Sequence, residues 1–309
     1  MQQAQLKIGV VGIAGGASTD ALLDAVAART GARHLVDMGE VVVDMGAGTM
    51  RSRGVDLCQF DAVIVKKIAA TYTPAAIDRL ELLAYLEGQG VRVFSRPARM
   101  IPLIDRLSGT VKLQRGGIPM PVTVVTEDPG HAAAAVRRLG ACVAKPLFST
   151  KARGMQVLRG DDPELAAAVA RFKEASGPVM YLQQLVDIPG RDLGVVFLGG
   201  EYLATYARVA RAGAWNTTTA AGGRYEAHEP GPEVIELARR AQALFGLDFT
   251  CVDVVETADG PRVFEVSAFG GFRGLIEGCG VDAAARYVDH VIAALTREGR
   301  GEAREVARG

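Results

Sequence analysis

Residues 251–267 read Cys251-Val-Asp-Val-Val-Glu-Thr-Ala-Asp-Gly-Pro-Arg-Val-Phe-Glu-Val-Ser267, and this stretch decides the fold. Apolar and polar residues alternate on both sides of residues 258–260, which predicts two antiparallel strands joined by a tight turn. A three-residue turn with Gly260 in the left-handed conformation sets Thr257 opposite Pro261. The odd length of this turn fixes the register of the whole hairpin.

That register sets Asp253 opposite Glu265 and Cys251 opposite Ser267, all on one face of the hairpin. Two carboxylates in direct opposition repel each other and destabilise a strand pair unless positive charge lies between them. Magnesium prefers carboxylate oxygens and keeps water and substrate phosphates as its other ligands. The hairpin by itself fits a magnesium site and a solvated face with incidental acids equally well.

The composition is that of a soluble globular protein. The chain has 309 residues, 49% of them hydrophobic and 23% charged, and its 35 basic residues balance its 35 acidic ones. This length is long for a single core, so two or three packed lobes are expected. Near-neutral charge gives no electrostatic case for a nucleic-acid or membrane partner.

Cysteine usage and the start of the chain favour a cytoplasmic protein. The cysteines are Cys58, Cys142, Cys251 and Cys279. They form no CxxC or Cys/His cluster, so reduced thiols are favoured over a zinc site. The apolar stretch 8–17 is too short to span a bilayer and lacks a strongly basic leader, so it predicts a first strand rather than a signal peptide.

The first 97 residues read as alternating strands and a helix. Residues 6–13, 60–65 and 91–94 are apolar runs typical of buried parallel strands, and residues 74–87 predict a helix that begins at its proline. Strand, helix and strand at this spacing indicate an α/β lobe with a parallel sheet.

The turn after the first strand carries Gly12, Gly15 and Gly16, with Ser18 or Thr19 as the expected cap of the next helix. A dinucleotide site would need the spacing GxGxxG, which these glycines do not have. A tight strand-to-helix turn is the better interpretation.

A small-residue loop follows the strand that ends in Lys145. Residues 147–154 carry Lys151 and Arg153 between two predicted strands. Backbone N–H groups and positive charge in such a loop close over polyphosphate. In isolation, an ordinary solvated hairpin tip explains the loop better.

The order of motifs covers most of the chain and resembles the ATP-grasp superfamily, and within it the RimK-like amino-acid ligases. The matching motifs are Phe60-Asp-Ala-Val-Ile64, Asp105-Arg106, Gly117-Ile-Pro-Met-Pro-Val122, Val143-Ala-Lys145, Gln183-Gln184, Gly190-Arg-Asp192, Arg208, Gly222-Gly223, Val252-Asp253 and Phe264-Glu265-Val266. No single motif is specific, and the evidence lies in the ordered set. The resemblance implies an ATP-grasp fold of α/β lobes behind a Rossmann-like, parallel-sheet domain. We expect domains at 1–97, 98–182 and 183–299, the last two being the central and C-terminal ATP-grasp lobes, and a frayed tail at 300–309.

The resemblance also implies the chemistry. Members of the family phosphorylate a carboxylate with ATP and Mg²⁺, and an amine then attacks the acyl phosphate to give an amide. By position, ATP would be held by Arg106, Lys145, Lys151, Gln184, Leu185, Asp192 and Asn216, magnesium by Asp253, Glu265 and Ser267, and the transferring phosphoryl group by Arg208. Gln184 and Leu185 would meet adenine, and Asp192 would meet the ribose.

The chain departs from the family pattern in several places. Ser267 replaces the usual asparagine and Gln184 the commoner glutamate. Gly194 stands where close relatives carry an arginine implicated in substrate binding, and residues 216–218 read Asn-Thr-Thr instead of Arg-Ser-Asn. The nucleotide side is mostly kept while the acceptor side differs, which favours a ligase with a different substrate.

A narrower resemblance concerns residues 94–97, 103–108 and 149–155. These segments resemble a RimK-like subgroup linked to tetrahydromethanopterin-dependent one-carbon metabolism in methylotrophic bacteria. The resemblance implies small-molecule carboxylate and amine substrates, with glutamate added to a precursor of a C1-carrier cofactor such as methylofuran, or to a protein acceptor. Exposed helices of the N-terminal lobe are compatible with a homodimer.

Three functions are therefore in contention. The first is an ATP-dependent carboxylate–amine ligase. The second is a nucleotide-binding regulatory protein whose altered metal site no longer turns over. The third, well behind, is an NAD-dependent dehydrogenase that uses the glycine turn at 12–16.

Overall fold

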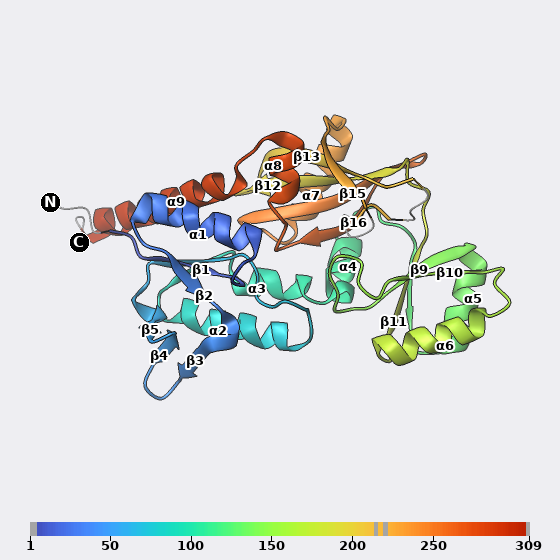
Figure 1. The fold of residues 1–309 in the computed structure, drawn as a ribbon, viewed down its shortest axis with the longest axis horizontal. Coiled ribbons are helices and arrows are strands. Elements are labelled where there is room, and N and C mark those ends of the chain that lie inside the picture. The colour runs from blue at the N-terminus through green and yellow to red at the C-terminus, as the bar shows by residue number, and fades with distance from the viewer. Residues whose placement is uncertain (1–4, 213–215, 219–221, 307–309) are drawn as a thin grey trace.

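The computed structural model describes residues 5–212, 216–218 and 222–306, with side chains up to residue 297. The described part of the chain contains four β-sheets, together with the helices that cover them. Figure 1 shows the N-terminal domain and the central lobe at opposite ends of the long axis, with the C-terminal sheet above and between them. The α/β class expected from the sequence is confirmed.

The N-terminal domain contains the expected parallel sheet, in the order β2-β1-β6-β7. Its elements are β1 (Ile8–Val11), α1 (Ala17–Thr30), β2 (His34–Val36), β6 (Ala62–Val65), α2 (Ala75–Gly88) and β7 (Arg92–Phe94). A three-stranded antiparallel meander, which the sequence analysis did not predict, is inserted between β2 and β6. Its strands are β3 (Val41–Asp44), β4 (Thr49–Ser52) and β5 (Val55–Asp56). The short 3₁₀ helices η1 (Met38–Glu40) and η2 (Leu57–Gln59) flank them.

The central lobe is an antiparallel sheet in the order β10-β9-β11-β8, covered by two helices. The segment leading into it contains α3 (Pro97–Met100), η3 (Ile101–Leu103) and α4 (Arg106–Arg115). The lobe itself contains β8 (Thr123–Thr126), α5 (Pro129–Leu139), β9 (Ala141–Lys145), β10 (Gln156–Arg159), α6 (Leu165–Ser176) and β11 (Met180–Gln184). This lobe has a separate, small core, in which alanines of α5 cluster with Leu165, Val169 and Phe172 of α6.

The C-terminal lobe is a five-stranded antiparallel sheet in the order β14-β13-β12-β15-β16. Its elements are β12 (Arg191–Leu198), β13 (Glu201–Val209), β14 (Arg224–Ala227), α7 (Pro232–Ala243), β15 (Phe249–Thr257), β16 (Gly260–Ser267), α8 (Arg273–Cys279) and α9 (Ala283–Val306). Apolar residues of α7 pack on one face of this sheet, and residues of α8 and α9 pack on the other. The polar face of the 251–267 hairpin belongs to the side covered by α8.

The hairpin has the expected pairing at its functional end but not at its tip. Asp253 pairs with Glu265 and Cys251 with Ser267, which confirms that part of the predicted register. At the tip, Thr257 lies opposite Gly260 rather than Pro261, so the turn is one residue shorter than predicted. A bulge next to Asp253 inserts one extra residue into β16 and restores the register.

The turn after β1 differs from its prediction in the way that α1 starts. The helix begins at Ala17, with Gly16 at the cap position and no side-chain cap. Ser18 Oγ instead accepts a hydrogen bond from the Phe272 N–H at 3.2 Å, and Thr19 is buried. A β-carbon on Gly12 would overlap the Thr19 side chain, so Gly12 serves close helix–strand packing.

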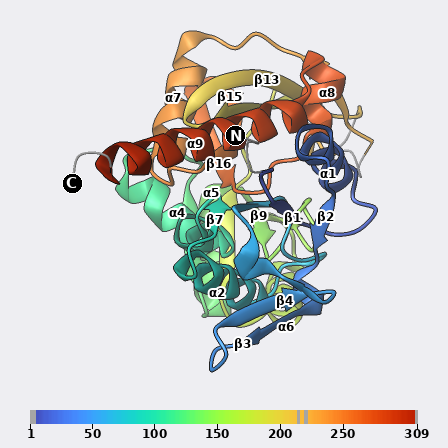
Figure 2. The same ribbon diagram turned by 90° about the vertical axis from the view of Figure 1, so that its left-hand side faces the viewer.

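The last helix joins the two ends of the chain. Figure 2 shows α9 crossing between the C-terminal sheet and the N-terminal domain, next to α1. Arg29 Nη2 of α1 lies 3.1 Å from Asp289 Oδ2 of α9. The helix extends from Ala283 to Val306. Within the described ranges, no helix combines the length and the apolar character needed to cross a membrane.

Glycines let the ring of Tyr206 lie between β12 and α8. A β-carbon on Gly194 or on Gly274 would overlap this ring, which is only 4% exposed. The arginine that close relatives are expected to carry at position 194 would have no room here. Tyr206 therefore fills the space in which, by the family resemblance, a substrate-binding arginine is expected.

Gly194→Ala should destabilise the fold by about 1–3 kcal/mol, because the new methyl group overpacks against Tyr206. Urea unfolding measures the loss, and Gly88→Ala is the matched control because a β-carbon there meets nothing within 4 Å. The cost should shrink in a Tyr206→Leu background, since the ring is gone. An equal effect at both glycines would contradict the packing argument.

Candidate active site

Arg208 on β13 lies between two carboxylates of neighbouring strands. Its Nε donates to Asp192 Oδ1 at 3.1 Å, its Nη2 also bonds Asp192 Oδ2, and Nη2 lies 3.0 Å from Asp253 Oδ2. Asp192 pairs with Arg208 across the β12–β13 ladder, and position 194 on β12 pairs with Asp253 on β15. Burial opposes the charge on Arg208, but Asp253 and Asp192 outweigh it and hold the pKa of the guanidinium above its ordinary value.

Arg106, at the start of α4, joins the same group of charged side chains, which is called the charged recess below. Asp105 caps this helix by accepting bonds from the N–H groups of Leu107 and Ser108, which fixes the first helical residue. Arg106 Nη1 donates to Glu265 Oε2 at 2.9 Å, and its Nε donates to Pro146 O at 3.3 Å. The Arg106 side chain is 8% exposed and that of Glu265 is 45% exposed, so water reaches the carboxylate end of this ion pair.

Lys145 enters the recess from the central lobe, at the end of β9. Its Nζ donates to Gln183 Oε1 at 2.6 Å and lies 5.4 Å from the centre of the Phe264 ring on β16. Burial, together with the charge of Arg106, lowers its pKa to about 7, and Glu265 and Asp253 oppose the shift. Lys145, Arg106 and the two hairpin carboxylates thus act on one another across two lobes.

The two opposed carboxylates differ in their electrostatics. Burial raises the pKa of Asp253 to about 7, with Glu265 and Asp192 adding to the rise and Arg208 opposing it. Burial also acts to raise the pKa of Glu265, but Arg106 and Lys145 outweigh it and the pKa lies below its ordinary value. The Asp253 side chain is 15% exposed and that of Glu265 is 45% exposed, which agrees with this difference.

The donor set on this face fits magnesium. Asp253 and Glu265 offer hard carboxylate oxygens side by side on paired strands. Ser267 Oγ accepts a bond from the Phe269 N–H at 3.3 Å and keeps a lone pair. No group of three or more His, Cys, Asp or Glu side chains in the described part of the chain is arranged for a metal.

The remaining predicted ATP residues lie in three separate segments. The Gln184 N–H donates to Val122 O at 2.8 Å and the Leu185 N–H to Ala141 O at 2.9 Å, where the central lobe ends. Lys151 lies exposed in the loop between β9 and β10. Asn216 Oδ1 accepts bonds from the N–H and hydroxyl of Thr218, and no described contact links Asn216 to the charged recess.

The N-terminal domain contributes residues that the sequence analysis missed. Tyr72 packs edge-on against Phe269, with ring centres 5.9 Å apart, and burial together with the charge of Glu265 raises its pKa. Lys66 Nζ donates to the carbonyl oxygen of Gly270 and lies 4.1 Å from the centre of the Phe272 ring. Lys66 follows directly after β6, and Tyr72 lies further along the same segment. Because sites in α/β domains form where parallel strands end, the position of this segment could have indicated both residues.

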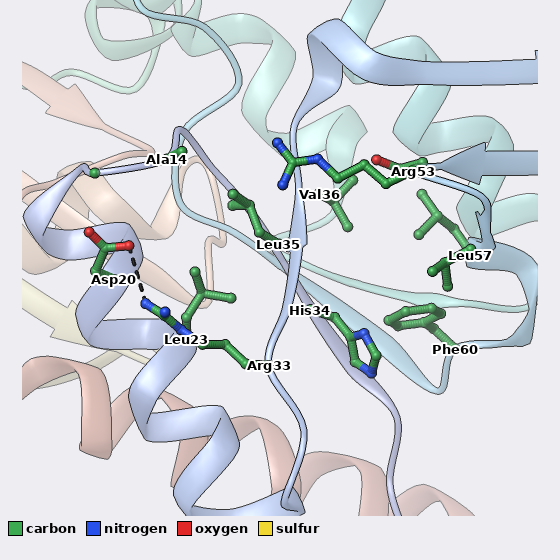
Figure 3. A pocket seen from close by; sticks show the side chains of 13 residues that line it. Ala14, Asp20, Leu23, Arg33, His34, Leu35, Val36, Arg53, Leu57 and Phe60 are labelled. Carbon is green, nitrogen blue, oxygen red and sulfur yellow. Dashed lines mark hydrogen bonds and ion pairs between the residues drawn. The ribbon is translucent and has the colours of Figure 1, made fainter.

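A separate hollow of about 400 Å³ lies in the N-terminal domain, beside β2. Figure 3 shows Arg33, His34 and Arg53 on its wall, together with apolar side chains. Arg33 pairs with Asp20 at 3.3 Å, and Arg53 pairs with Glu40. Because its arginines are neutralised within the protein, this hollow offers no unbalanced charge to a substrate.

Comparison with known proteins agrees with this geometry. A model of the RimK-like ATP-grasp domain matches residues 105–291. The tetrahydromethanopterin:alpha-L-glutamate ligase of Methanosarcina acetivorans is 25% identical over 264 residues, which cover 76% of this chain and 81% of the relative. The ribosomal protein bS6–L-glutamate ligase of Salmonella paratyphi B is 25% identical over 266 residues, or 84% and 87% of the two chains.

Solved structures share the fold. A RimK domain protein ATP-grasp from Sphaerobacter thermophilus superposes with a TM-score of 0.71 at 26% identity, covering 92% of this chain and 98% of the other. The ATP-grasp ligase PsnB, in a complex with a precursor variant, Mg and ADP, gives a TM-score of 0.74 at 22% identity, with coverages of 94% and 99%.

The fold and the charged recess thus define an ATP-grasp ligase, an enzyme that forms carbon–nitrogen bonds at the expense of ATP. Within that class, the chain belongs to the RimK-like ATP-grasp family.

Changes at the two hairpin acids should have opposite effects on stability. The folded-state pKa of Asp253, about 7, lies above its ordinary value of 3.8, so its ionisation destabilises the fold as pH rises between these values. Asp253→Asn should therefore gain stability relative to wild type on going from pH 5 to pH 8.

Glu265→Gln should instead lose stability at both pH values. The lowered pKa of Glu265 means that its charge stabilises the fold above its ordinary pKa, and Arg106 would lose its partner. Melting temperatures in a chelator-containing buffer test both variants. Identical pH profiles for the two would contradict the assigned electrostatics.

Proposed function

We propose that the enzyme adds glutamate to the carboxylate of an acceptor through an acyl phosphate. The observation that carries this proposal is the convergence of three cations and three carboxylates from separate segments in one recess. Its members are Arg106, Lys145, Arg208, Asp192, Asp253 and Glu265. Glutamate as the incoming amine rests on two relatives that are both named glutamate ligases.

The reaction has two steps. The acceptor carboxylate attacks the γ-phosphorus of ATP, the bond to the bridging oxygen breaks, and ADP leaves. The amine of glutamate then attacks the carbonyl carbon of the acyl phosphate, loses a proton, and expels inorganic phosphate. Phosphoryl transfer of this kind depends on positioning and on distributed positive charge more than on covalent catalysis by the protein.

The residues of the recess suit these steps. Lys145 and Arg106 would hold the phosphates, and Arg208 would hold the transferring phosphoryl group and the oxyanion of the tetrahedral intermediate. Asp253 and Glu265, with Ser267, would hold magnesium, which supplies positive charge to the phosphate oxygens when bound. Asp192 fixes the guanidinium of Arg208 by a two-point contact, so in this arrangement it orients Arg208 as well as standing where the ribose is expected.

The acceptor is the less constrained part of the proposal. The two glutamate-ligase relatives are named for different acceptors, a pterin and a ribosomal protein. Residues 94–97, 103–108 and 149–155 favour a small-molecule acceptor, a precursor of a C1-carrier cofactor. Four free cysteines accord with a cytoplasmic setting, and a homodimer through N-terminal helices is part of the same proposal.

Phosphate release with ATP, magnesium and glutamate tests the proposal against a panel of carboxylate acceptors that includes pterin carboxylates. Tyramine-like amines test the reverse case, in which glutamate supplies the carboxylate. Mass spectrometry of the product should show one or more added glutamate residues. Nucleotide binding without phosphate release for any amine and carboxylate pair would instead indicate a regulatory nucleotide-binding protein.

Lys145→Met should weaken ATP binding by about 10–100-fold, because one charge-assisted phosphate contact is lost. Since the lysine has a pKa of about 7 in the free protein, and phosphates favour its charged form, ATP binding at pH 8 should take up a proton. Calorimetry in two buffers of different ionisation enthalpy measures this uptake. Wild-type affinity in the variant would remove Lys145 from the nucleotide site.

Arg208→Lys should lower kcat by about 10²-fold while leaving the KM for ATP within a few-fold of wild type. Lysine keeps the charge but lacks the planar fork that contacts two oxygens of the transition state. Arg224→Lys is the matched control, because this arginine is exposed and pairs only with Glu226 among the described residues. A raised KM with normal kcat would make Arg208 a ground-state binding residue.

A further inference from the structure

Three basic side chains meet where the loop between β9 and β10 touches the N-terminal domain. Arg153 Nη1 of the loop lies 3.4 Å from Ala70 O, in the segment that follows β6. Lys67 stands three residues before Ala70 and Lys151 two residues before Arg153. Burial lowers the pKa of Lys67, and the charges of Lys151 and Arg153 lower it further. Three like charges therefore act on one another across a domain boundary.

This basic cluster (Lys67, Lys151 and Arg153) is not neutralised by the protein. In the described part of the chain, no carboxylate lies within ion-pair distance of its members. Arginines elsewhere in the N-terminal domain do have such partners, as Arg29 pairs with Asp289 and Arg53 with Glu40. Gathered cations without a counter-charge are unfavourable unless an anion joins them.

The cluster adjoins the reaction recess. The loop starts beside Arg106, whose N–H donates to Leu147 O at 3.1 Å, and it ends at Arg153. The segment after β6 carries Lys67 near its start and Tyr72 further on, and the Tyr72 ring packs against Phe269, two residues after the hairpin.

The loop holds its basic residues in an unusual backbone conformation. Lys151 and Ala152 both have positive φ, 58° and 56°. The left-handed conformation is unfavourable for a residue with a β-carbon.

We propose that Lys67 and Arg153, which lie next to the predicted ATP residue Lys151, form a subsite for a carboxylate that does not react, carried by one of the two organic substrates. This inference rests on the proposed glutamate ligation and deepens it, because it requires at least one substrate to be a dicarboxylate or a longer polyanion. Glutamate and an acceptor that already ends in glutamate share this chemistry. The reacting carboxylate would lie at Arg208 and the second one at the cluster.

The separate KM values for ATP, glutamate and acceptor test the proposal. Lys67→Met and Arg153→Met should each raise the KM for one organic substrate by about tenfold, with kcat and the KM for ATP near wild type. The substrate affected identifies the source of the carboxylate. Lys67→Arg should retain most of the affinity, and Arg171→Gln on α6, an exposed position, is the matched control for loss of one charge. A rise in the KM for ATP alone, or no rise at all, overturns the proposal.

An equilibrium measurement separates this proposal from the proposed function. The wild-type protein should bind tri-glutamate more tightly than tri-glutamine at low salt, and Lys67→Met should remove most of the difference. Binding that does not distinguish the two peptides, or the two proteins, overturns the subsite even if ligation is observed. If no acceptor in the panel is turned over but binding remains charge-dependent and requires Lys67, the proposed glutamate ligation is refuted and the subsite is retained.

Discussion

Charge balance in the recess is the constraint on which the rest of the structure depends. Burying an ionised group is costly unless it is paired, and removal of one partner leaves the other uncompensated. Arg208 is shared between two carboxylates, and Arg106 neutralises a third from a helix 159 residues away in sequence. The lobes must therefore lie close enough for these pairs to form, so the same contacts that prepare the site also hold the lobes together.

The β-bulge in the 251–267 hairpin serves that balance. A regular ladder continued from the two-residue tip would shift Asp253 out of line with Glu265 and turn one of them to the opposite face. The extra residue is inserted immediately beside the acidic pair. Bulges next to active sites commonly re-aim a side chain in this way. Here the bulge sets both acids toward Arg106 and Arg208.

Sequence periodicity predicted much of the fold, but it predicted less of the active site. Apolar strands such as β1 and β6 were predictable because parallel strands are buried on both faces, and the acidic pair was predictable from alternation. The meander of β3 to β5 was missed because its short strands mix polar and apolar residues. The correct pairing of Asp253 and Glu265 came from a wrong turn length that the bulge compensated. Contacts such as Arg106 with Glu265, or Tyr72 with Phe269, join distant segments, and no local pattern encodes them.

The packing of α9 on α1 has a consequence for synthesis of the protein. Leu22, Leu23 and Val26 of α1 share a buried cluster with Tyr287, Val288 and Val291 of α9. A ribosome makes the first of these segments more than 250 residues before the second, so the apolar side of α1 stays uncovered until almost the whole chain has emerged. Nascent chains would then need a chaperone, or a temporary cover from elsewhere in the chain, for most of their translation. A stop near the 3′ end of the message would release a protein with an intact recess and an open hydrophobic face, which makes it a candidate for quality-control proteolysis rather than a shorter enzyme.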